Sequence, residues 1–116
     1  MLRRKRKDLA AEPLVINIRD LVVDVNRCEV FVGEKQANLT AAEFKLLETL
    51  VRAPGRVFTR SELVERAFGY NYNGLERTVD AHIMNLRKKV QVVGQPPFIK
   101  TVFGVGYKIS GENDVS

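Results

Sequence analysis

The sequence predicts an α+β domain in which a four-stranded antiparallel sheet precedes three helices and a C-terminal β-hairpin. Three observations carry this prediction. Residues 14–38 are rich in β-branched side chains with short polar breaks, the apolar period changes from two to 3.6 at Leu39, and the last apolar segment is divided by Gly104 and Gly106. The chain has 116 residues, which is enough for one core and too few for two cores of ordinary size.

The composition excludes several classes of protein. A single cysteine, Cys28, leaves no internal disulfide and no multi-cysteine zinc site, and there is only one histidine, so we expect no metal and no cofactor. No apolar run approaches the roughly 18 residues of a membrane-spanning helix, which predicts a soluble cytoplasmic domain. Cys28 follows an apolar strand pattern and is expected to be a small core residue.

The first part of the chain divides into a tail and a sheet. Residues 1–13 include the basic run Arg3 to Lys7 and end at Pro13, which indicates a basic linker or tail, either a solvated tether or a nucleic-acid-binding arm. The folded domain is predicted over 14–110, and the polar residues 111–116 are expected to be disordered. Within the domain, short strands at 14–18, 21–25, 28–32 and 35–38 have connections of about two residues, which favour antiparallel hairpins.

Two helices with matching N-terminal signals follow. Thr40 and Glu43 form one capping box, and Thr59 and Glu62 form another. The segment 53–55 ends the first helix, a short strand at 57–58 precedes the second, and Gly69 stops it. The side chains predicted to face inward are Phe44, Leu47, Leu50 and Val51 in the first helix and Leu63, Val64, Ala67 and Phe68 in the second.

The rest of the domain is predicted as a loop, a third helix and a hairpin. Residues 70–75 are expected to form a loop that exposes Tyr70 and Tyr72, and the helix is expected to run from about Glu76 to Val92. The hairpin has arms at 98–102 and 107–109, joined by the turn 103–106.

The third helix has an outer face suited to DNA. At about 100° per residue, its buried stripe is Val79, Ile83, Leu86 and Val90, and the opposite face holds Arg77, Ala81, Met84, Asn85 and Lys88, with Thr78, Asp80 and Arg87 on the flanks. An amide, long cations, a carboxylate and small apolar groups match the base edges of the major groove. The alternative is an ordinary amphipathic helix with solvated cations. Residues 77–100 carry five cations and one carboxylate, a net +4 of the chain's +5, which suggests a polyanion-binding face.

The order of helix, helix, recognition helix and hairpin is that of a winged helix-turn-helix, whose hairpin can reach the DNA backbone or minor groove. Lys100, Thr101 and the N–H groups of Gly104 and Gly106 are candidate phosphate partners.

The sequence resembles the C-terminal effector domain of OmpR/PhoB-family response regulators. The motifs that carry the resemblance are Leu39-Thr-Ala-Ala-Glu-Phe44, Pro54-Gly-Arg-Val57 with Arg60-Ser-Glu-Leu63, Arg77-Thr-Val-Asp-Ala-His-Ile83 with Leu86-Arg-Lys-Lys89, and Ile99-Lys-Thr-Val102 with Gly104-Val-Gly-Tyr107. The resemblance implies control of transcription by tandem copies bound to promoter DNA. It also implies an upstream receiver domain, absent from this chain, in a phosphorelay with a cognate sensor histidine kinase.

The resemblance also implies roles for individual residues. The base-reading positions would be Thr78, Asp80, Ala81, Met84 and Asn85. The DNA-backbone positions would be Arg77, His82, Arg87, Thr101 and Tyr107. Lys88 on the outer face of the helix and Lys100 and Gly104 in the hairpin complete the set expected to contact the DNA backbone. The loop that touches DNA or RNA polymerase in relatives would include Phe68, Tyr70, Asn71, Tyr72 and Asn73.

Two departures from the family pattern bear on sequence preference. Met84 and Asn85 stand where many relatives have one or two cations, and Phe103 replaces a wing arginine that enters the minor groove, which puts that contact in doubt. Packing of Phe103 against the third helix is favoured over contact with a sugar. An enzyme is not predicted, because His82 has no catalytic partner motif. The rival function is a protein-interaction domain that uses the basic helix and the Tyr70/Tyr72 loop.

Overall fold

The structure is a computed structural model that describes residues 14–69 and 73–110. The proposed linker 1–13, the tail 111–116 and the residues Tyr70, Asn71 and Tyr72 lie outside the described residues. The chain forms the predicted series of four strands, three helices and a hairpin, with a short strand between the first two helices.

The four N-terminal strands form an antiparallel meander. β1 (Val15–Ile18), β2 (Leu21–Asp24), β3 (Glu29–Val32) and β4 (Lys35–Ala37) pair in sequence order. Alternate residues Leu21 and Val23 of β2 are fully buried, so one face of this sheet joins the core.

One sequence prediction in this sheet is wrong. Cys28 is exposed and has a φ of 55°, because it ends the turn between β2 and β3 instead of beginning β3. The strand starts one residue later, at Glu29. Cys28 therefore does not contribute to the core.

The helices begin where their capping residues predicted. α1 (Ala41–Val51) is capped by Thr40, and α2 (Arg60–Phe68) by Thr59; in both, the complete reciprocal capping box is present. Gly69 ends α2 in the left-handed conformation at a φ of 87°, which glycine adopts without steric cost. The predicted helix boundaries are confirmed at these positions.

α3 (Asn73–Val90) starts three residues before its predicted start at Glu76 and ends two residues before its predicted end at Val92. Gly74 indicated a loop, but a glycine costs a helix only about 1 kcal/mol relative to alanine, and tertiary packing of a long helix outweighs this. The predicted loop at 70–75 is therefore wrong over its last three residues.

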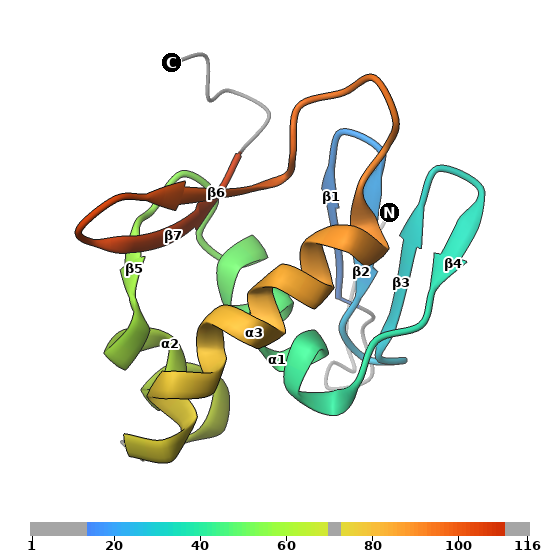
Figure 1. Ribbon diagram of the computed structural model, residues 1–116. Coiled ribbons are helices and arrows are strands. Elements are labelled where there is room, and N and C mark those ends of the chain that lie inside the picture. The colour runs from blue at the N-terminus through green and yellow to red at the C-terminus, as the bar shows by residue number, and fades with distance from the viewer. Residues whose placement is uncertain (1–13, 70–72, 111–116) are drawn as a thin grey trace.

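The C-terminal hairpin completes a second sheet. β6 (Ile99–Val102) and β7 (Gly106–Ile109) are antiparallel, and β5 (Phe58–Thr59) pairs with the other edge of β7. Figure 1 shows α1 between the two sheets, with α3 crossing in front of α1 from the side of the hairpin and α2 toward the four-stranded sheet. A single apolar cluster joins both sheets and all three helices.

Candidate nucleic-acid interface

α3 divides into a buried and an exposed face as the sequence predicted. Its buried stripe consists of Val79, Ile83, Leu86 and Val90, each at most 1% exposed. The exposed residues among those whose side chains are described are Thr78, Asp80, Ala81, Met84, Asn85, Lys88 and Lys89, and the last of these is paired with Glu43 of α1. The side chain of Met84 is 56% exposed although it is apolar. This face is therefore available for a ligand. The side chains of residues 73–77, which include the candidates Asn73 and Arg77, are outside the part of the chain whose side chains are described.

Asp80 is held by two neighbours from other elements. Arg60, at the start of α2, donates to both carboxylate oxygens, with Nε–Oδ1 at 2.8 Å and Nη2–Oδ2 at 3.2 Å. The Tyr107 hydroxyl in β7 donates to Oδ1. The hydrogen bond from Arg60 and then the one from Tyr107 lower the pKa of Asp80, despite partial burial that acts in the opposite direction. Asp80 therefore joins α2, α3 and the hairpin.

Arg87 forms a second link between α3 and the hairpin. Its Nε donates to the carbonyl oxygen of Ile99 at 3.2 Å, and its Nη2 donates to the hydroxyl of Thr101. The guanidinium also lies 5.7 Å from the centre of the Tyr107 ring. Arg87 is half-buried, and two of its five N–H donors are used inside the domain.

Tyr107 is largely internal, which the sequence did not indicate. Its side chain is only 6% exposed, and burial followed by the hydrogen bond to Asp80 raises the pKa of its hydroxyl. Lys100 and Thr101 on β6 are half-buried. Of the candidate wing contacts, Gly104 is exposed, at a φ of 81° in the turn.

The tip of the hairpin differs from the prediction at Phe103 and Gly106. Phe103 is 91% exposed, so its predicted packing against the third helix is wrong: the turn 103–105 projects beyond the last pairs of β6 and β7. Gly106 is buried within the sheet and is not part of the exposed turn. A Cβ at Gly106 would lie 1.9 Å from the Phe58 carbonyl oxygen, so β5 can approach β7 only because this residue is glycine.

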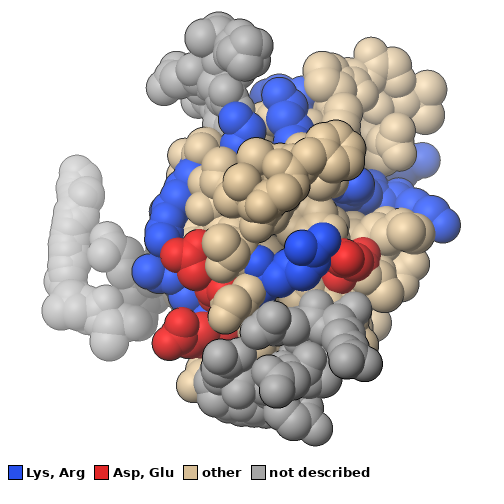
Figure 2. Space-filling model, turned by 60° about the vertical axis from the view of Figure 1, so that its left-hand side comes forward, with Lys and Arg blue, Asp and Glu red and all other residues tan. Residues whose placement is uncertain are grey.

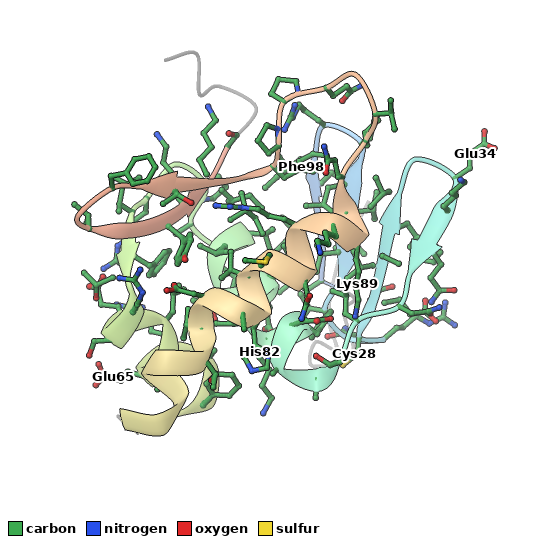
Figure 3. The ribbon with its side chains drawn as sticks, in the orientation of Figure 1. Cys28, Glu34, Glu65, His82, Lys89 and Phe98 are labelled. Carbon is green, nitrogen blue, oxygen red and sulfur yellow. The ribbon has the colours of Figure 1, made fainter. Side chains whose placement is uncertain are left out.

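His82 and Phe68 lie at the edge of the candidate surface. His82 is half-buried and points from α3 away from the hairpin (Figure 3). Phe68 is half-buried at the end of α2, and the loop it was grouped with lies outside the described residues. His82 is therefore not directed at the hairpin, and both side chains are only partly accessible to a ligand.

Cations flank the hairpin side of the molecule. Figure 2 brings the hairpin and α2 forward, and blue side chains border an uncharged prominence while red ones are confined to the lower part of the described surface. Sequence reasoning gave no role to Arg60, which the structure places beside Asp80. The pairing could not be predicted from the sequence, because Arg60 lies 20 residues before Asp80 and no local pattern links the two.

Among the described residues, no group of three or more His, Cys, Asp or Glu side chains could hold a metal ion. In the same residues, no helix is long and apolar enough to cross a membrane.

Comparison with known proteins gives a consistent set of similarities. Residues 33–109 match the family described as "Transcriptional regulatory protein, C terminal". The response regulator MprA of Mycobacterium tuberculosis H37Rv is 37% identical over 107 residues, which cover 92% of this chain and 46% of MprA. The chain spans about half the length of the curated relatives it matches.

Two of the similar solved structures are DNA complexes. The RstA DNA-binding domain of Klebsiella pneumoniae, in complex with the RstA box, is 32% identical with a TM-score of 0.72, over 83% of this chain and 96% of that one. The DNA-binding domain of response regulator AdeR, in complex with an intercistronic region, is 34% identical with a TM-score of 0.71, over 82% and 98% of the two chains.

Proposed function

Because the chain belongs to the family of transcriptional regulatory protein C-terminal domains, we propose that it binds double-stranded DNA as the output domain of a two-component response regulator. The observation that carries this proposal is the exposed face of α3, with Ala81, Met84 and Asn85, beside a hairpin tied to the same helix. A helix presenting mixed polar and small apolar groups fits the major groove, and a neighbouring hairpin can reach the backbone.

The residues of this face have different roles in the proposed complex. Asn85 is assigned to bridge the N6 and N7 atoms of an adenine, and Ala81 and Met84 are assigned to contact a thymine methyl. Thr78 is assigned to a base edge as well. Lys88, Lys100 and Gly104 are assigned to phosphates, together with Arg60, whose side chain is 47% exposed beside Asp80.

Asp80 is assigned a positioning role in place of base reading. Its carboxylate already accepts hydrogen bonds from Arg60 and Tyr107. The three hydrogen bonds from these two side chains use most of the roughly four acceptor sites of a carboxylate, so little capacity remains for a cytosine amino group. Arg87 and Thr101 likewise hold the hairpin against α3, so their effect on DNA is through the orientation of the wing.

The complete regulator is proposed to act on tandem half-sites. Two copies of the domain would bind sites about one helical turn, roughly 10 to 10.5 bp, apart in the same strand sense. Regulation by a receiver domain and its cognate sensor kinase, and contact with RNA polymerase, belong to the same proposal and rest on the response-regulator relatives.

The test is selection of bound duplexes from a random pool, followed by titration of the selected duplex and a scrambled one across a salt series. The selected duplex should bind at least tenfold more tightly at moderate salt, and log Kd should vary linearly with log salt concentration. If no duplex exceeds random DNA by tenfold, the proposed function is wrong. The protein-interaction alternative gains no support from the similar structures, two of which are DNA complexes.

A further inference from the structure

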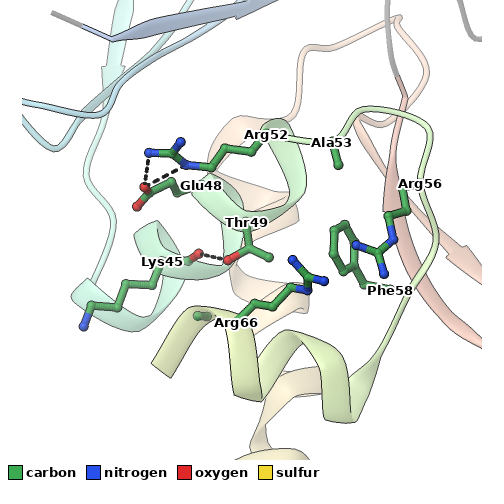
Figure 4. Close-up of a pocket in the computed structure, with 9 residues that line it drawn as sticks. Lys45, Glu48, Thr49, Arg52, Ala53, Arg56, Phe58 and Arg66 are labelled. Carbon is green, nitrogen blue, oxygen red and sulfur yellow. Dashed lines mark hydrogen bonds and ion pairs between the residues drawn. The ribbon is translucent and has the colours of Figure 1, made fainter. Parts of the chain in front are cut away.

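A second basic surface lies apart from α3 and the β6–β7 hairpin, and it shares only α2 with the proposed DNA contacts, through Arg60 at the start of that helix. A cavity of about 450 Å³ opens between α1, the α1–β5 connection, β5 and α2 (Figure 4). Its lining contains no residue of α3 or of the β6–β7 hairpin among the described residues. The lining residues are Lys45, Glu48, Thr49, Arg52, Ala53, Arg56, Phe58, Arg66 and Ala67.

The charge on this cavity is not apparent from the sequence. Residues 14–76 carry eight cations and nine carboxylates, a net charge of −1, yet four of those cations line this one cavity with a single carboxylate. That carboxylate, Glu48, is paired with Arg52, with Oε2 2.9 Å from Nη2. Folding therefore concentrates positive charge on one face of a nearly neutral segment.

Two of the guanidinium groups are held over the same aromatic ring. The Cζ atoms of Arg56 and Arg66 lie 4.4 and 5.9 Å from the centre of the Phe58 ring. Arg56 has one ion pair, to Glu62 at 3.1 Å. In the described part of the chain, neither Lys45 nor Arg66 has a direct ion pair. Cations gathered in this way repel one another, and an anion bound between them removes that repulsion.

We propose that this cavity binds a carboxylate-rich segment of a partner protein. A recess of this size admits one or two acidic side chains, whereas a DNA backbone needs an extended track of cations. The planar guanidinium groups of Arg56 and Arg66 match a carboxylate with two parallel hydrogen bonds, and Lys45 adds a mobile charge at the rim. The partner would therefore attach to the regulator while α3 and the hairpin remain on DNA.

The experiment measures binding of a fluorescein-labelled 12-residue peptide of alternating glutamate and glycine by fluorescence anisotropy. A peptide with glutamine in place of glutamate controls for backbone binding. The test variant is Lys45→Gln with Arg66→Gln. The control variant is Arg27→Gln with Lys35→Gln, which removes the same charge from exposed positions in the β2–β3 turn and at the start of β4. Circular dichroism and thermal unfolding confirm that both variants fold.

We expect the test variant to bind the acidic peptide at least fivefold more weakly and the control variant to stay within twofold of the unsubstituted protein. In the unsubstituted protein, the peptide should shift the amide resonances of Thr49, Ala53 and Ala67, so the site is located even without a variant. Saturation with the selected duplex should change peptide affinity by less than twofold.

Equal losses in the two variants would overturn the proposal, because they would show that only net charge matters. Displacement of the peptide by duplex, or an equal loss of duplex affinity in the test variant, would overturn it as well, because the cavity would then belong to the DNA surface. This inference does not depend on the proposed function. If no duplex binds in the salt titration, DNA binding is wrong, but the peptide measurement still tests whether the cavity binds carboxylates.

Discussion

Replacing Asp80 with alanine distinguishes two possible roles of this residue: holding the parts of the domain in position and reading a DNA base. The substitution removes the hydrogen bonds from Arg60 and from Tyr107. The Arg60–Asp80 pair is about half exposed on both sides, 47% and 50%, so its contribution to the free energy of unfolding is at most about 1 kcal/mol. Tyr107 is 6% exposed, and a buried hydroxyl left without a partner costs about 1–3 kcal/mol.

The expected loss for Asp80→Ala is therefore about 1–3 kcal/mol, most of it from Tyr107. Chemical denaturation and thermal melting measure it, and Tm should fall by roughly 4 °C or more. Tyr107→Phe removes the same hydrogen bond from the other side. The double variant should lose less than the sum of the two single losses, by about 0.5–1.5 kcal/mol, because the two residues share one interaction.

The same variant has a distinct signature on DNA and with pH. In its positioning role, Asp80→Ala weakens the selected and the scrambled duplex by similar factors, because Arg60 and the hairpin lose their orientation. The pKa of Asp80 is lowered in the folded protein, so its stabilisation is complete above the unfolded value of about 3.9 and is lost as pH falls through the folded value. The variant should lack this acid-dependent part. Unchanged stability, with a loss of about 1–3 kcal/mol on the selected duplex alone, would refute the positioning role and restore base reading.

Four further substitutions test other parts of the structure. Asn85→Ala should cost about 1–3 kcal/mol on the selected duplex and relax base preference at one or two positions, as measured by competition with single-base variants of the site. Arg87→Ala should lower affinity for all duplexes and flatten the salt slope, because the hairpin loses its orientation and with it the phosphate contacts assigned to Lys100 and Gly104. Equal losses for both variants on selected and random DNA would show that the reading face is misassigned. Glu43→Gln should lower the free energy of unfolding at neutral pH by about 1–2 kcal/mol. Burial alone would raise the pKa of Glu43, but the hydrogen bonds from Lys89 and Thr40 outweigh it and lower that pKa, so the variant should lose less stability than the unsubstituted protein as pH falls below about 4.3. Denaturation of both proteins across this pH range measures the effect. Gly106→Ala should destabilise the domain by about 3 kcal/mol, because the added Cβ meets the backbone of Phe58 and forces β5 from β7; a variant as stable as the unsubstituted protein in denaturant would contradict that packing.

Local chemistry predicted most of the fold. Both capping boxes, centred on Thr40 and Thr59, and the left-handed stop at Gly69 involve residues at most a few positions apart, so the sequence contains the whole interaction. The buried stripe of α3 was predictable for the same reason, since helical periodicity alone fixes which positions share a face.

The internal contacts of the candidate site were not predictable, because they join distant positions. Asp80 meets residues 20 and 27 positions away, and Lys89 reaches Oε1 of Glu43, 3% exposed, at 2.7 Å across 46 positions. A single sequence offers no signal for such pairs. Phe103 failed for another reason: its apolar side chain suggested packing, whereas the turn at the end of the hairpin gives it nothing to pack against.

The contacts of α3 are crowded into one part of the helix. Arg87 holds the hairpin, Lys89 holds the start of α1, and these two residues are only two positions apart. Asp80, which holds Tyr107, lies about two and a half turns earlier. A shift of the last turns of α3 would therefore disturb the hairpin and the first helix at the same time, so the orientation of the wing and the packing of α1 are not independent.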